Sequence, residues 1–188
     1  MSHDPKHGHE HKHGHDHLNQ PPHDPNDIEA LDGSIFGDDQ PCFGCSPSNP
    51  FGMKLKPVRE GREITVRYTA PPEFQGPAGV MHGGLVTTLA DELAGWVVIG
   101  VRKQFGFTGA IESRLLKPIR IGVEVFGRAK IVSENARTLK IDVRLHQEGA
   151  EMYRGMFSFV ILDEAGTEKV MGMRLPESWR KYARAKVE

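Results

Sequence analysis

The sequence of 188 residues has no excess of charge of either sign, because 24 lysines and arginines are balanced by 25 aspartates and glutamates. Without a basic excess, binding to nucleic acid through bulk electrostatic attraction is not expected. The chain has only two cysteines and no pattern of a secretory leader, which argues against a disulfide-stabilised extracellular protein and predicts a cytoplasmic one. Its longest apolar run, residues 93–101, is too short and too interrupted to cross a bilayer, so we expect no membrane partner.

Apolar residues are also scarce in residues 1–40, where histidine, proline, aspartate and glycine dominate. A segment with so little to bury cannot offset the conformational entropy lost on folding, so we predict a disordered tail. Alternating imidazoles in a flexible chain can chelate zinc, nickel or copper. We expect weak binding of a divalent metal by this tail, whose alternating histidines are His7, His9, His11, His13, His15 and His17.

The chain does contain one long segment of helical character, residues 83–101. Its bulky apolar residues recur at intervals of three and four, which predicts a helix with one face packed on a core. The opposite face carries small residues and a single carboxylate, Asp91, so another group can approach it closely. The apolar positions are Leu85, Leu89, Leu93 and Trp96, and the small ones are Gly84, Thr87, Thr88, Ala94 and Gly95.

The start of this predicted helix is chemically distinctive, because His82 is followed by the pair Gly83 and Gly84. Unpaired amides at a helix N-terminus bind anions and stabilise developing negative charge, and glycines let a ligand approach them. The simpler interpretation is that the glycines only allow a tight turn into the helix. If Gly83 and Asp91 both act in catalysis, one chain cannot supply both, because eight residues of helix separate them by about 12 Å. A second copy related by a two-fold axis would bring its own carboxylate to the glycines.

Strand-like alternation of apolar and polar residues occurs once before the predicted helix and four times after it. Short turn-forming breaks separate the later runs, which favours an antiparallel meander. The order of strand, long helix and four strands predicts an α+β layer in which a curled antiparallel sheet wraps one largely buried helix. These strands are expected at residues 63–70, 108–116, 123–132, 138–147 and 151–162, with a further strand at 53–58 and a short C-terminal helix from Pro176.

The two cysteines, Cys42 and Cys45, form a Cys-x-x-Cys pair. This spacing permits a zinc or redox site, but a tetrahedral zinc ion needs four ligands, and His82 and His146 would have to supply the other two. The alternative is a compact turn, rich in proline, glycine and asparagine, that leads into the strand at 53–58. We predict the turn, with no metal ion and no cofactor in the folded domain.

Three motifs stand out in combination: Met81-His82-Gly83-Gly84 followed by Leu89-Ala90-Asp91-Glu92, Cys42-Phe43-Gly44-Cys45 through Asn49-Pro50-Phe51-Gly52, and Leu115-Leu116-Lys117-Pro118 followed by Gly122. With the order of elements, they resemble the hot-dog fold acyl-CoA thioesterases, specifically the phenylacetate-pathway (PaaI-type) group. The resemblance covers about residues 41–162. It implies a dimerising hot-dog domain at 41–165, between the tail of residues 1–40 and a C-terminal extension at 166–188.

The resemblance also implies roles for individual residues. The amide of Gly83 would polarise the thioester carbonyl, with His82 positioning that loop. Asp91 of the partner subunit would act as general base on water or as nucleophile on the carbonyl. Thr108 matches a position where related enzymes orient the water. Relatives often carry an asparagine six residues before the histidine; here a glycine stands at that position, and Gln75 directly before it is the expected substitute.

The implied reaction is hydrolysis of an acyl-CoA or related thioester to the free acid and thiol. Thioesters are activated acyl groups, so one oxyanion hole and one partly desolvated carboxylate can suffice, without a Ser-His-Asp triad or a metal. Glu92 ranks below Asp91, because the helical rotation turns it toward the Leu/Trp side. The expected contacts with the acyl group and with the CoA phosphates are Gly84, Phe74, Trp96, Arg114, Lys117 and Arg120.

The same resemblance implies a homodimer and permits a pair of dimers, a homotetramer. Three alternatives remain. A hot-dog dehydratase or hydratase would pair a histidine with an acid at a different spacing, which is absent here. A non-catalytic acyl-CoA sensor would be expected to lack the helix acid Asp91 and to carry a DNA-binding appendage. In a metal-handling protein, the histidine-rich tail would be the functional part.

Overall fold

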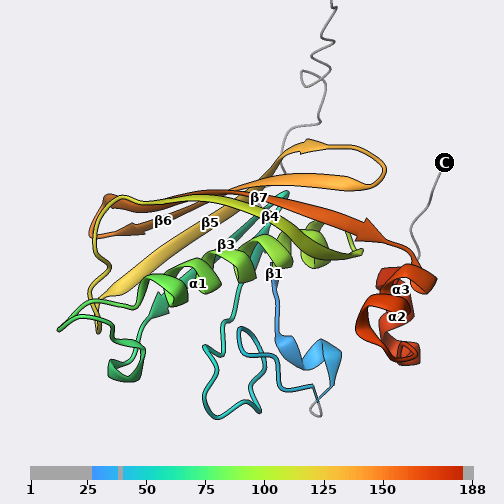
Figure 1. Cartoon of the computed structure of the whole chain (residues 1–188), viewed down its shortest axis with the longest axis horizontal. Coiled ribbons are helices and arrows are strands. Elements are labelled where there is room, and N and C mark those ends of the chain that lie inside the picture. The colour runs from blue at the N-terminus through green and yellow to red at the C-terminus, as the bar shows by residue number, and fades with distance from the viewer. Residues whose placement is uncertain (1–26, 38–39, 184–188) are drawn as a thin grey trace, which may run out of the picture.

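The computed structural model describes residues 27–37 and 40–183. One long helix, α1 (Gly83–Trp96), lies across one face of a seven-stranded antiparallel sheet, and the C-terminal helices form a group beside one end of that sheet (Figure 1). The predicted α+β architecture, with one long helix covered by the sheet, is confirmed. The tail histidines and their expected metal binding lie outside the described residues.

The strands pair in the order β1-β2-β3-β5-β6-β7-β4. The three strands β5, β6 and β7 form a meander, whereas β4 pairs only with β7 and is therefore an edge strand. Glu148 and Gly149 make the tight turn between β6 and β7, both with positive φ, as a two-residue hairpin requires. The bounds are β1 (Ile28–Ala30), β2 (Val58–Glu60), β3 (Glu63–Thr69), β4 (Phe105–Leu115), β5 (Glu124–Glu134), β6 (Thr138–Gln147) and β7 (Ala150–Leu162).

The helix α1 buries one face against the sheet. The apolar stripe is turned slightly from the predicted one, because Leu85 is only half-buried whereas Ala94, expected on the open face, is fully buried. After Trp96 the helix continues as a wider π turn, η3 (Val97–Val101), which keeps its first two valines in the core. The buried residues of α1 are Val86, Leu89, Ala90, Leu93, Ala94 and Trp96.

By length and composition alone, the continuous helical segment Gly83–Val101 would be long enough and apolar enough to cross a membrane. We expected the apolar run to be too short to cross a bilayer because we considered only residues 93–101. The whole helical segment is 19 residues long. Half of the segment is buried inside the protein. The core helix of a globular domain gives the same result.

A glycine in β5 sets how closely the sheet approaches α1. A Cβ at Gly127 would lie 2.7 Å from Leu93 Cδ2 and 3.0 Å from methyl groups of Leu145 and Val66. We expect Gly127→Ala to lower the free energy of unfolding by about 1–3 kcal/mol through overpacking, measured by urea denaturation. Gly95→Ala is the control, because nothing lies within 4 Å of a Cβ there. Equal stability of Gly127→Ala and wild type would contradict this packing.

Residues 28–36 are structured, so the prediction of a disordered tail up to residue 40 is wrong for this part. Ile28–Ala30 pairs with β2, and the 3-10 turn η1 (Gly33–Phe36) follows. The ring of Phe36 packs against Trp179 at 5.3 Å and Trp96 at 6.2 Å between centroids. A few apolar residues suffice here because they pack on a core that other parts of the chain provide.

The strand expected at 53–58 is also wrong, because only Val58 belongs to a strand, β2. Lys54 has a φ of 52°, which interrupts an extended backbone. The expected C-terminal helix is present as η4 (Glu177–Trp179) and α3 (Arg180–Ala183), and both Trp179 and Tyr182 are buried. A short helix before it, α2 (Glu164–Met171), was not predicted. The 3-10 turn η2 (Pro72–Phe74) precedes α1.

Candidate active site

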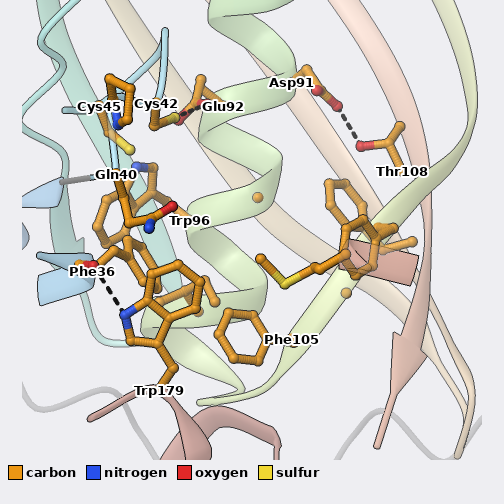
Figure 2. A pocket seen from close by; sticks show the side chains of 17 residues that line it. Phe36, Gln40, Cys42, Cys45, Asp91, Glu92, Trp96, Phe105, Thr108 and Trp179 are labelled. Atoms are coloured by element: carbon orange, nitrogen blue, oxygen red, sulfur yellow. Dashed lines mark hydrogen bonds between the residues drawn. The ribbon is translucent and has the colours of Figure 1, made fainter. Parts of the chain in front are cut away.

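A carboxylate and a hydroxyl from two elements meet beside the middle of α1. Thr108 on β4 donates its hydroxyl to Oδ1 of Asp91 at 2.7 Å, across 17 residues of sequence (Figure 2). Burial raises the pKa of the Asp91 carboxyl above its ordinary value, and the Thr108 hydrogen bond opposes this rise. A half-buried carboxylate held in this way is suited to take a proton from water.

A cavity of about 560 Å³ opens beside this pair. Its wall comes from the N-terminal segment, α1, β4, β7 and the C-terminal extension. Trp96, expected to contact the substrate, lines the cavity, but Phe74 is not among its lining residues and instead packs in the core with its ring 6.1 Å from that of Phe43. The apolar wall includes Phe36, Ile99, Phe105, Phe107, Phe159 and Trp179.

Residues of the N-terminal segment and of the C-terminal extension meet on one side of the cavity. The indole nitrogen of Trp179 donates to the backbone oxygen of Phe36 at 3.0 Å (Figure 2). Phe105 lies beside both rings, at 6.3 Å from Phe36 and 6.1 Å from Trp179. The sequence did not point to Phe36 or Phe105 as cavity residues, because Phe36 was assigned to the tail and Phe105 lies before the strand expected at 108–116. The expected C-terminal helix from Pro176 was the only prediction that included Trp179.

Cys42, Cys45 and Glu92 form a second polar cluster on the cavity wall. The Cys42 thiol donates to Oε1 of Glu92 at 3.4 Å. Burial raises the pKa of the Glu92 carboxyl to about 8. The sequence placed Glu92 toward the apolar side of the helix, and the structure shows that it reaches the Cys42–Cys45 turn there. Figure 2 shows this cluster and Asp91 on opposite sides of α1.

The helix start is organised by His82, which is the N-cap residue of α1. Its Nδ1 accepts a hydrogen bond from the amide of Gly84 at 3.1 Å. Gly84 was predicted to contact the substrate, but its amide already has this acceptor within the chain. Among the described residues, no acceptor is found for the amide of Gly83, the first residue of the helix. Gln75 lies in the preceding loop, where its side-chain oxygen accepts the amide of Gly79 at 3.0 Å. Gln75 therefore holds the loop that leads into the helix.

The three expected cations differ in their positions. Lys117 borders a hollow of about 330 Å³ that Gly83 also lines. Arg114 lies on β4 beside a different hollow. Arg120 is ion-paired with Glu148, so its charge is compensated. Of these three, Lys117 is the one that shares a hollow with the free amide of the helix start.

Within one chain the two halves of the expected site lie apart. Asp91 and Gly83 are on the same helix, separated by about 12 Å. The edge strand β4 runs beside the half-buried face of α1 and is exposed along most of its length. Ile111 is 41% exposed and Leu115 is 55% exposed on this strand. Apolar side chains on an unpaired strand edge are typical of an interaction surface.

Comparison with known proteins gives one family match over part of the chain and several structural neighbours. Residues 78–152 match the thioesterase superfamily. This segment includes the helix start, Asp91, Thr108 and the strands β4 to β6. The comparison with curated proteins gave no match.

Three solved structures show the shared architecture. A thioesterase superfamily protein is 20% identical, with a TM-score of 0.57 over 65% of this chain and 60% of the other, so this chain spans less than two thirds of that protein. A hypothetical thioesterase from Streptococcus pneumoniae, solved with coenzyme A, is 23% identical, with a TM-score of 0.52 over 55% of this chain and 82% of the other. A Streptococcus mutans protein bound to acetyl CoA is 21% identical, with a TM-score of 0.53 over 57% of this chain and 87% of the other. Residues 78–152 are therefore similar to the thioesterase superfamily, and the chain shares the fold of these three structures.

Proposed function

We propose that this protein hydrolyses an acyl-CoA, or a related acyl thioester, to the free acid and the thiol. The observation that carries this proposal is the half-buried Asp91 carboxylate, fixed by Thr108 at 2.7 Å and facing an apolar cavity. The carboxylate is positioned to activate water, and the cavity beside it can hold an acyl chain. The similarity of residues 78–152 to the thioesterase superfamily supports the same reaction.

The reaction needs a donor for the carbonyl oxygen in addition to a base. We assign this role to the amide of Gly83, at the positive end of α1. Asp91 takes a proton from water, and the resulting hydroxide adds to the thioester carbonyl carbon. The tetrahedral intermediate then collapses, the C–S bond breaks, and the leaving thiolate takes up the proton that Asp91 received. The products are one carboxylic acid and one free thiol, and no metal is needed in these steps.

We further propose that each site combines Gly83 of one subunit with Asp91 of the partner subunit. Eight helical residues hold the two groups about 12 Å apart within a chain, which is too far for both to act on one carbonyl. Two copies of α1 lying antiparallel across a two-fold axis bring them together. The exposed apolar edge of β4 supports such pairing, because a second copy can cover it.

The neighbours support the choice of substrate. One was solved with coenzyme A and another bound to acetyl CoA. The Streptococcus pneumoniae protein was also solved with one aspartate, and with one threonine, replaced by alanine. These are the residue types that meet here in Asp91 and Thr108. Lys117, beside the helix start, is our candidate contact for the CoA portion.

A thiol-release assay with a panel of acyl-CoA substrates tests the reaction. Because the cavity wall is largely aromatic, we expect higher kcat/KM for bulky apolar acyl groups than for acetyl-CoA. Binding of the whole panel without thiol release would contradict hydrolysis and favour a sensor. Conversion of 3-hydroxyacyl to enoyl thioesters, again without thiol release, would favour a dehydratase.

Co-expression of two inactive variants tests whether sites are shared. Asp91→Asn and Gly83→Pro, each alone, are expected to be nearly inactive. Random pairing makes half of the dimers mixed, and each mixed dimer carries one intact site, so the mixture should recover about a quarter of wild-type activity. No recovery, with mixed dimers shown by native mass spectrometry, would place both groups in one subunit and contradict the shared site.

A further inference from the structure

We propose that Cys42, Cys45 and Glu92 hold one zinc ion on the wall of the cavity. One atom from each side chain lies within 4.8 Å of the others, and Cys42 Sγ is 3.4 Å from Glu92 Oε1. Sulfur and oxygen ligands of one tetrahedral zinc, at about 2.3 Å and 2.0 Å from the metal, lie about 3.5 Å apart. The observed separation, which a hydrogen bond spans here, is therefore also one that two ligands of a common ion can adopt.

The backbone of the turn is shaped for this approach. A Cβ at Gly44, between the two cysteines, would lie 1.9 Å from the carboxyl carbon of Glu92. The glycine thus lets the carboxyl group enter the Cys42–Cys45 turn. Backbone hydrogen bonds hold the turn in place, from Met53 to the oxygen of Phe43 at 2.7 Å and from Leu55 to the oxygen of Gly44 at 2.9 Å. The two cysteines are therefore held by the hydrogen-bonded turn, and Glu92 is held by the helix α1.

The donor set suits zinc rather than a hard cation. Thiolates favour zinc over magnesium or calcium, and a carboxylate is an accepted third ligand. The sequence suggested that His82 and His146 would be needed, but His82 caps α1 and His146 lies in β6. Glu92, 50 residues from Cys42, provides the missing contact. Three protein ligands leave a fourth zinc position open, and it faces the cavity because all three residues line it.

Such an ion would tie the turn of residues 42–45 to α1. This inference stands independently of the proposed hydrolysis, because it rests on the three ligands and not on Asp91 or Gly83. Zinc at this place would add one coordination site to a cavity wall that is otherwise mostly apolar. It would also place a bound water or substrate atom within the same cavity as the Asp91 carboxylate.

Cobalt substitution of the full-length protein tests the site. After zinc removal under reducing conditions, one equivalent of Co²⁺ is expected to give a thiolate-to-cobalt charge-transfer band, which imidazole ligands do not produce. Zinc should displace it with a stoichiometry of one. Cys42→Ser and Glu92→Gln are expected to weaken Co²⁺ binding at this site by at least about tenfold, because loss of a ligand exceeds the usual effect of losing a supporting residue.

Two matched controls separate this site from other metal binding. Glu124→Gln removes an exposed carboxylate on β5 and should leave the band unchanged. Replacing His7, His9, His11, His13, His15 and His17 with alanine should also leave it unchanged. The proposal is overturned if wild type gives no charge-transfer band, if Cys42→Ser keeps it, or if Cys42 and Cys45 are found joined in a disulfide under these conditions. Cys42 is exposed, so its serine variant is expected to fold, as circular dichroism can verify.

Discussion

Replacing Asp91 with asparagine is expected to lower kcat/KM for acyl-CoA hydrolysis at least about a hundredfold. Asparagine keeps the shape of the side chain and can still accept the Thr108 hydroxyl, but it cannot take a proton from water. The loss should therefore be in chemistry, with kcat reduced and the binding of a non-hydrolysable acyl-CoA thioether little changed. Thiol release and isothermal titration calorimetry measure these two quantities separately.

Two further variants sharpen this prediction. Glu124→Gln, an exposed carboxylate on β5, is expected to turn over at the wild-type rate. Thr108→Ser keeps the hydroxyl, whereas Thr108→Ala removes it, so only the alanine variant should lose activity. Wild-type turnover by Asp91→Asn, with an intact circular dichroism spectrum, would remove Asp91 from the proposed mechanism.

The parts of the fold that could be predicted are those with a strong local period. The strands β3, β5, β6 and β7 alternate apolar and polar residues, and α1 carries an apolar stripe, so their positions followed from the sequence. The short helix α2 has few apolar residues and contains a glycine. Its ends were nevertheless marked, by Asp163 capping Gly166 and by Gly172 in the left-handed conformation.

The candidate site divides in the same way. The spacing of His82 and Asp91 could be read directly, and the structure brings Asp91 to Thr108. Contacts that depend on tertiary packing could not be read, because no local pattern encodes them. Glu92 meets Cys42 across 50 residues, and Phe36 meets Trp179 across 143. The ion pair of Arg120 with Glu148 also depends on tertiary packing. Because its charge is compensated by Glu148, Arg120 is a weaker candidate for binding a CoA phosphate than its sequence position suggested.

Replacing Gly83 with proline is expected to lower kcat at least about a hundredfold, the usual effect of removing one oxyanion-hole donor. Gly83 is the first residue of α1, the helical position where proline is best tolerated because its missing amide makes no helical hydrogen bond. The preceding residue, His82, has φ −58° and ψ 130°, which a following proline allows. The substitution therefore removes the catalytic donor and preserves the helix.

Gly83→Ala is the matched comparison, because it adds a Cβ at the same place and keeps the amide. In both variants this Cβ would lie 3.1 Å from a methyl group of Leu115, a flexible side chain that can move by the small amount required. We expect alanine to retain most of the wild-type kcat and proline to lose it, with similar melting temperatures for both. If alanine loses as much activity as proline, the space in front of the helix matters and the amide does not. If the Gly83→Pro variant has normal kcat, the amide at the helix start does not hold the carbonyl oxygen. The argument for a site shared between two subunits then fails as well, because it requires Gly83 and Asp91 to act on the same carbonyl.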